Sequence, residues 1–162
     1  MARSTPDPNI ATIVGVISDT HGLLRRTAVG ALAGSDLILH AGDVGAHSVL
    51  ARLAELGPTR AVRGNTDGGS LGAELPGTAW VEVGQCVVYL LHDLDRLDLD
   101  PEAAGVTVVV IGHTHRPLNE RRGNVLYFNP GSAGPRREGW PVTVGRLVIR
   151  GRTVHAEHIV LD

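Results

Sequence analysis

The chain has 162 residues, of which 43% are hydrophobic and 20% charged, which predicts one globular domain with a sizeable core. Every one of the 15 basic residues is arginine, so no lysine is present for a Schiff base or a P-loop. The net charge is −2 and the arginines are scattered, so we expect no bulk nucleic acid as a partner. The single cysteine, Cys86, excludes an intrachain disulfide, and no apolar stretch is long enough to cross a bilayer. We therefore expect a cytoplasmic protein that does not bind membranes.

Residues 1–9 carry two prolines among polar neighbours, which is typical of a disordered leader before a single domain over residues 10–162. The first part of that domain alternates apolar runs with helical spacing. Such alternation predicts a parallel sheet, which binds its ligands at the carboxyl ends of its strands. The expected strands are 10–17, 37–39 and 59–62, and the expected helices are 23–32 and 46–56.

The second part of the chain is mainly β in character, with apolar runs separated by glycine-rich turns. The first two runs flank Gly84-Gln85 and indicate a hairpin. The strands expected here are 80–83, 86–91, 106–111, 125–128, 142–149 and 153–160. The segments 68–77 and 93–102 are expected to be long loops.

Polar motifs directly follow five of these apolar runs. Taken singly, each has an ordinary explanation, because aspartate can cap a helix and asparagine can occupy a turn. Together they bring oxygen and imidazole donors, which suit divalent cations without thiolate. Seven such donors are too many for one four-coordinate zinc and favour two ions that share a carboxylate. The motifs are Asp19-Thr20-His21, Gly42-Asp43, Gly64-Asn65-Thr66-Asp67, His92 and Gly112-His113-Thr114-His115.

This ordered set resembles that of the calcineurin-like metallophosphoesterases, and within them the small bacterial and archaeal phosphodiesterase group. The similarity runs from residue 13 to residue 160, and the stretch Asn129-Pro-Gly-Ser132 also resembles the late part of that group. The resemblance implies an α/β fold in which two mixed β-sheets pack as a sandwich flanked by helices, in four layers α/β/β/α. A dinuclear metal site is then expected on the strand-end loops.

The resemblance also implies a role for each motif residue. Asp43 is expected to bridge two divalent metal ions, with Mn²⁺ favoured and Ni²⁺, Fe²⁺, Co²⁺ or Zn²⁺ as alternatives. Asp67 is expected to accept a hydrogen bond from a ligand histidine or, alternatively, only to end a turn. The remaining ligands are Asp19, His21 and His115 for the first ion and Asn65, His92 and His113 for the second. The residues expected in the catalytic machinery are Asp43, Asn65, His92 and Asp67.

The function implied by the resemblance is hydrolysis of a small organic phosphodiester by a hydroxide that bridges the two metals. A phosphomonoesterase of the same superfamily and a non-catalytic interaction scaffold with this fold are the alternatives. The complete set of ligand residues favours an enzyme over a scaffold. Thr66 stands where many phosphatases of the superfamily carry a proton-donating histidine, which favours a diesterase. A homo-oligomer is compatible with the sequence.

One departure from the family pattern follows the ligand His92. The small phosphodiesterases commonly read His-Gly-His here, whereas this chain reads His92-Asp93-Leu94. The metal ligand is kept, but the shape of the adjacent loop and any substrate contact made by it are expected to differ. His40, two residues before Gly42, is expected to have a structural or supporting role.

Overall fold

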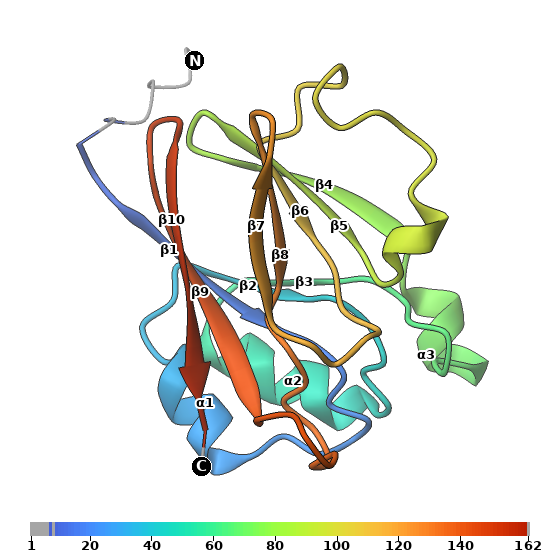
Figure 1. Ribbon diagram of the computed structural model, residues 1–162. Coiled ribbons are helices and arrows are strands. Elements are labelled where there is room, and N and C mark those ends of the chain that lie inside the picture. The colour runs from blue at the N-terminus through green and yellow to red at the C-terminus, as the bar shows by residue number, and fades with distance from the viewer. Residues whose placement is uncertain (1–6, 8, 162) are drawn as a thin grey trace, which may run out of the picture.

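The computed structural model describes residue 7 and residues 9–161, so the leader expected at residues 1–9 lies largely outside the described residues. Ten strands of the described chain form two mixed five-stranded sheets, which confirms the predicted α/β sandwich (Figure 1). The strand order is β10-β9-β1-β2-β3 in the first sheet and β4-β5-β6-β8-β7 in the second. No helix in this part of the chain is long and apolar enough to cross a membrane.

The first sheet is parallel in its centre and antiparallel at one side. β1, β2 and β3 are parallel, while β9 pairs antiparallel with β1 and β10 antiparallel with β9. The carboxyl ends of the three parallel strands therefore share one edge, as the alternation of strands and helices predicted. The strands are β1 (Thr12–Ile17), β2 (Leu37–His40), β3 (Thr59–Ala61), β9 (Thr143–Arg150) and β10 (Thr153–Val160), and the connecting helices are α1 (Arg26–Leu32) and α2 (His47–Leu56).

The second sheet differs from the first in having an antiparallel strand at each edge. β5, β6 and β8 are parallel, and β4 and β7 flank them in the antiparallel direction. The segments that follow β5 and β6 carry His92 and His113, so these residues leave the sheet at the same edge. The strands are β4 (Thr78–Val83), β5 (Cys86–Leu91), β6 (Val108–Val110), β7 (Leu118–Arg122) and β8 (Val125–Asn129).

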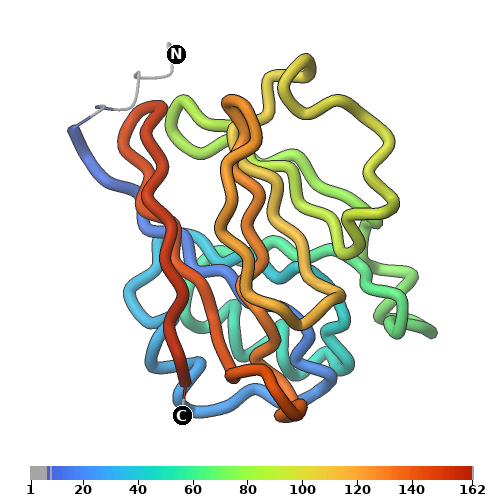
Figure 2. The backbone as a smooth tube through the Cα atoms, in the orientation of Figure 1, coloured from blue at the N-terminus to red at the C-terminus, as the bar shows by residue number. Residues whose placement is uncertain are grey.

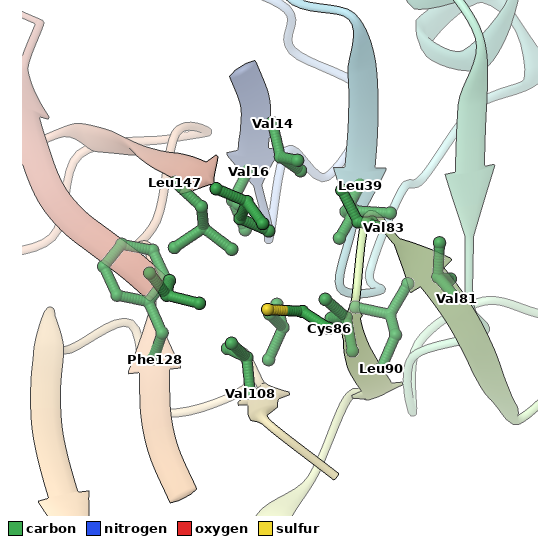
Figure 3. Close-up of a cluster of buried hydrophobic side chains, with 14 of the residues drawn as sticks. Val14, Val16, Leu39, Val81, Val83, Cys86, Leu90, Val108, Phe128 and Leu147 are labelled. Atoms are coloured by element: carbon green, nitrogen blue, oxygen red, sulfur yellow. The ribbon is translucent and has the colours of Figure 1, made fainter. Parts of the chain in front are cut away.

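The main core lies between the two sheets, because β-branched and aromatic side chains of both inner faces meet there. Figure 3 shows Val16 and Leu39 of the first sheet facing Val108 and Leu90 of the second. The helices α1 and α2 pack on the outer face of the first sheet through residues such as Leu32.

The outer face of the second sheet is covered by the segment after β5. Leu94, Leu97 and Leu99 pack there, and the described residues of this layer contain only the one-turn 3-10 helix η1 (Leu94–Arg96). The acidic segment predicted as a loop over 93–102 is therefore mostly irregular.

Two elements were not predicted from the sequence. The segment 68–77, expected to be a loop, contains the helix α3 (Gly69–Glu74). Its glycines favour no regular structure, but Leu71 is buried and the Arg63 guanidinium donates to the carbonyls of Gly72 and Leu75 at its end. The strand β7 is largely exposed and shows no apolar alternation, so it forms through its pairing with β8.

Candidate metal centre

The five polar strand ends meet at one place, between the carboxyl edges of the two sheets. The residues assigned to the first metal lie together there: Asp19 Oδ1 is 3.2 Å from His115 Nε2 and 3.8 Å from His21 Nε2. One donor atom from each of these three residues falls within 4.8 Å of the others. Residues separated by almost a hundred positions thus form one compact group of donors.

The residues assigned to the second metal lie beside the first group. Asn65 Oδ1 is 3.0 Å from His92 Nε2 and 3.1 Å from His113 Nδ1. Asp43 Oδ2 is 3.3 Å from His92 Nε2 and 3.7 Å from His21 Nε2, so its carboxylate stands between the two groups. Asp19 Oδ1 also reaches toward this side and lies 4.0 Å from His92 Nε2.

A hydrogen bond to the backbone orients His92. Its Nδ1 lies 2.7 Å from the carbonyl oxygen of Ala41, which can only accept, so Nδ1 carries the proton. The lone pair is then on Nε2, which points toward Asp43 and Asn65. This arrangement is typical of metal-ligating histidines, whose second nitrogen donates to a carbonyl or carboxylate.

His40 takes part in a chain of hydrogen bonds rather than in the donor groups. The Gly42 amide donates to its Nδ1 at 3.1 Å, so Nε2 carries the proton and donates to Thr20 Oγ1 at 2.9 Å. The Thr20 hydroxyl in turn donates to the Val44 carbonyl at 2.8 Å. Burial lowers the pKa of His40 to about 4, so its ring is neutral at physiological pH. His40 therefore ties together the loops after β1 and β2.

The backbone of the site has an uncommon conformation. Among the described residues, the non-glycine residues with positive φ all belong to the candidate ligands, with φ from 47° to 70°. Such conformations cost free energy and are retained where the surrounding structure enforces them, often at functional sites. The residues concerned are Asp19, His21, Asp43, His113 and His115.

Close packing of glycines against the ligands supports this conformation. A Cβ atom at Gly112 would meet Asp19 Oδ2 at 2.8 Å and would also strike the Ser18 hydroxyl. A Cβ atom at Gly64 would strike the Asp43 carboxylate. The backbone therefore approaches both carboxylates more closely than any other residue type would allow.

The residues present fit divalent metal ions. Three of their side-chain atoms are buried without a hydrogen-bond partner in the described part of the chain: Asp19 Oδ1, His21 Nε2 and His115 Nδ1. Burial of an unpaired carboxylate oxygen is costly, and a cation within reach of Asp19 Oδ1 and His21 Nε2 would remove that cost. The donor set of carboxylate, amide and imidazole is also one that divalent transition metals accept.

The charges of the site suit a cation as well. Burial raises the pKa of Asp19, but the neighbouring His115 ring and Ser18 hydroxyl outweigh it and hold that pKa below its usual range. Burial opposes ionisation of Asp43 in the same way, yet the His92 ring and the Thr66 amide lower its pKa strongly. Both carboxylates are therefore ionised at neutral pH. Burial opposes protonation of His92, but the Asp43 and Asp19 carboxylates outweigh it and hold the pKa of His92 above its ordinary value.

Asp67 lacks the histidine partner of the first expectation, while its hydrogen bonds with Gly64 fit the alternative, a turn that ends at Asp67. Within the described structure its carboxylate does not receive a hydrogen bond from a ligand histidine. It instead accepts three backbone amides, which join the loop after β2 to the loop after β3 and so position Asp43 and Asn65. The donors are Val44 at 3.2 Å, Gly45 at 3.0 Å and Gly64 at 2.9 Å.

Asn129 is a supporting residue that reasoning from the sequence missed. Its buried Nδ2 donates to the Gly112 carbonyl at 3.0 Å and to Thr114 Oγ1 at 3.2 Å. These bonds hold the segment that carries His113 and His115. The sequence showed only that the stretch from Asn129 to Ser132 resembles a late segment of the small phosphodiesterases. It indicated no role for Asn129.

The segment that follows Asn129 returns to the first metal group. Figure 2 shows residues 130–142 beside residues 18–25 at one end of the molecule. Ala133 donates to the Ser18 carbonyl at 3.1 Å, and the Arg25 guanidinium donates to the Gly134 carbonyl. These hydrogen bonds fix the loop that carries Asp19 to the segment after β8.

A two-sheet sandwich with adjoining groups of aspartate, asparagine and histidine at its strand ends defines a metal-binding protein of the phosphoesterase type. The family model of the calcineurin-like phosphoesterase superfamily domain matches residues 13–152, and the chain belongs to this superfamily.

Comparison with known proteins agrees with this assignment. The chain is 33% identical over 159 residues to a probable metallophosphoesterase of Methanothermobacter thermautotrophicus, covering 91% of each chain. It shares its fold with a solved archaeal phosphodiesterase at a TM-score of 0.75 and 23% identity, covering 91% of this chain and 100% of the other. It is equally similar in fold to vacuolar protein sorting 29 of Cryptosporidium parvum, at a TM-score of 0.76 and 18% identity, covering 93% and 98%.

Proposed function

We propose that this protein is a dinuclear metal-dependent phosphodiesterase that acts on a small organic phosphodiester. The position of Asp43 carries the proposal, because its Oδ2 lies 3.7 Å from His21 Nε2 and 3.3 Å from His92 Nε2. A carboxylate between two groups of donors suits a pair of divalent cations, of which we favour Mn²⁺. Such a pair would lower the pKa of the attacking water and neutralise charge that develops on the phosphoryl oxygens.

The residues of the site favour water over a side chain as the nucleophile. The Ser18 hydroxyl is buried and donates to Asp19 Oδ2 at 2.6 Å, so it is not free to attack phosphorus. Asn65 and the candidate ligand histidines are held in place at the strand ends beside the two carboxylates. In this proposal the protein positions the metal ions through these side chains and offers no side-chain nucleophile that would compete with water.

Thr66 favours diesters over monoesters as substrates. It is exposed beside Asn65, and its amide donates to Asp43 Oδ1 at 2.9 Å. A threonine hydroxyl is not an acid at neutral pH, so it does not protonate a basic leaving group. The named activity of the archaeal phosphodiesterase with this fold also supports a diesterase.

A non-catalytic scaffold is the second candidate, because vacuolar protein sorting 29 has the same fold. Against it, all seven candidate ligands are present, and their donor atoms lie in two groups close enough to bind metal ions. The positive φ values of the candidate ligands also favour a functional metal site over a fold that is kept without metal binding.

Hydrolysis of bis(p-nitrophenyl) phosphate tests the proposal. Protein loaded separately with Mn²⁺, Ni²⁺, Co²⁺ or Zn²⁺ should release p-nitrophenolate, a chelator should stop the reaction, and added metal should restore it. Asp43→Asn should be inactive, whereas Glu74→Gln, a change to an exposed carboxylate away from the donor groups, should keep full activity. Folded wild-type protein without turnover on any of these ions would instead favour the scaffold.

A further inference from the structure

A cavity of about 360 Å³ opens beside the metal centre, which places it in the lower part of the size range of small-molecule sites. It shares His113 with the candidate ligands, and Asp93 lies next to it, with Oδ2 3.9 Å from His113 Nε2. The lining includes the apolar side chains of Ile111 and Leu118. A molecule whose phosphate binds at the metal centre can therefore extend into this cavity.

Trp140 and Arg116 form another part of its wall. The Arg116 guanidinium stands over the Trp140 ring, 5.1 Å from its centroid, and both residues line the cavity. Indole rings and guanidinium planes both stack well on aromatic groups. An aromatic ring thus fits this cavity better than a flexible polar group.

The lining of the cavity also carries charged side chains. Asp93 and Asp95 both line the cavity, against one arginine, and Asp93 stands on the side of the metal centre. Asp93 is also the residue that departs from the family pattern after His92. A second anionic group on the substrate would be repelled at this position, because its charge would lie close to a partly buried carboxylate.

We infer that this cavity binds an uncharged aromatic group on the side of the phosphodiester that does not leave. The inference rests on the proposed diesterase function and adds a substrate class to it. Trp140 and Asp93 are then specificity-determining residues. Trp140 selects an aromatic ring, and Asp93 selects a ring without negative charge.

Two diesters with the same leaving group test the role of the cavity. Methyl p-nitrophenyl phosphate and phenyl p-nitrophenyl phosphate differ only in the group that remains. We expect the KM of the phenyl ester to be roughly 10-fold lower in the wild type, and Trp140→Ala to raise it roughly 3- to 10-fold without affecting the methyl ester. The matched control is Trp80→Ala, because Trp80 is as exposed as Trp140 but lies on β4, away from the cavity. Equal KM values for the two esters in the wild type would overturn the inference.

The charge preference is tested with a 4-carboxyphenyl p-nitrophenyl diester. Its KM should exceed that of the phenyl ester by roughly 10-fold in the wild type, and Asp93→Asn should reduce this ratio. A ratio that is the same in wild type and Asp93→Asn would remove Asp93 from the inference.

A binding measurement separates the cavity from catalysis. The indole N–H signals of Trp80 and Trp140 can be assigned by NMR with Trp80→Phe. In the 162-residue chain with diamagnetic Zn²⁺, diphenyl phosphate should shift the Trp140 signal and dimethyl phosphate should not. A Trp140 signal unmoved by diphenyl phosphate would contradict the inference. If neither methyl nor phenyl p-nitrophenyl phosphate is hydrolysed but diphenyl phosphate still shifts the Trp140 signal, the proposed function fails and the cavity assignment stands.

Discussion

Asp43 and His92 belong to different sheets, yet Oδ2 of Asp43 lies 3.3 Å from Nε2 of His92. Asp43 follows β2 of the first sheet and His92 follows β5 of the second. The candidate metal centre therefore spans the junction between the sheets, and its geometry depends on how the two sheets pack. The apolar core between the sheets supports the metal site as well as the fold.

Asp43→Asn and Asp67→Asn should separate a ligand from a supporting residue. Asp43→Asn removes the charge between the two donor groups, and we expect a loss of activity beyond the roughly 10- to 100-fold typical of residues that act through a ligand. Asp67→Asn weakens three backbone hydrogen bonds and should cost about 1–3 kcal/mol in the free energy of unfolding, with a smaller loss of activity. Initial rates at saturating metal and urea unfolding measure both effects. Equal losses of activity would show that Asp43 does not bridge.

Metal stoichiometry tests the pairing of the donor groups. Elemental analysis and calorimetry at saturating Mn²⁺ should give two ions per chain, because the two groups together hold more donors than one ion takes from protein. His113→Ala should lower the stoichiometry or the affinity of one ion, whereas His47→Ala, an exposed histidine on α2, should change neither. One ion or fewer bound to folded wild-type protein would contradict the dinuclear assignment.

His40 should make the stability of the metal-free protein depend on pH. Its pKa of about 4 in the folded state lies below the ordinary value of 6.5, so between these values the unfolded chain binds the proton more readily. The stability due to neutral His40 is therefore fully present above pH 6.5 and is lost as the pH falls toward 4, by about 3 kcal/mol in total. The lowered pKa values of Asp19 and Asp43 matter only below this window, near and under their ordinary value of 3.8.

The measurement is urea unfolding at pH 7, 6 and 5 in the presence of chelator, on wild type and His40→Gln. We expect the variant to be less stable at pH 7 and its stability to fall less steeply with acid. Parallel pH dependences in the two proteins would show that His40 is not the titrating group.

The rate of hydrolysis should depend steeply on the leaving group. Without an acid at Thr66, alkyl esters should react slowly and activated aryl diesters well, since general acid catalysis is worth roughly 10²- to 10⁴-fold. Thr66→His should accelerate poor leaving groups selectively, and Thr66→Asn serves as the control for size and polarity. A series of aryl diesters with graded phenol pKa values, with metal content verified, gives the slopes. A flat dependence in the wild type would mean that another group already supplies the proton.

The sequence by itself predicted the residues of the candidate metal centre and the strand ends on which they stand. Apolar runs that stop at Asp19, Asp43 and Asn65 are local features of the chain, and the rule that parallel strands share a carboxyl edge brings these residues together. The hairpin around Gly84 was predicted for the same reason, because its turn and flanking strands are neighbours in the chain.

Only the tertiary structure decided the features that depend on contacts between distant segments. Two of the three partners of the Asp67 carboxylate are backbone amides of the loop after β2. The helix α3 depends on Arg63 and buried Leu71, and the exposed strand β7 depends on its pairing with β8. Trp140 reaches the cavity beside His113 only because the segment after β8 folds back over the strand ends. None of these has a periodic pattern in the sequence, because each is stabilised by hydrogen bonds and packing that exist only after the two sheets have come together.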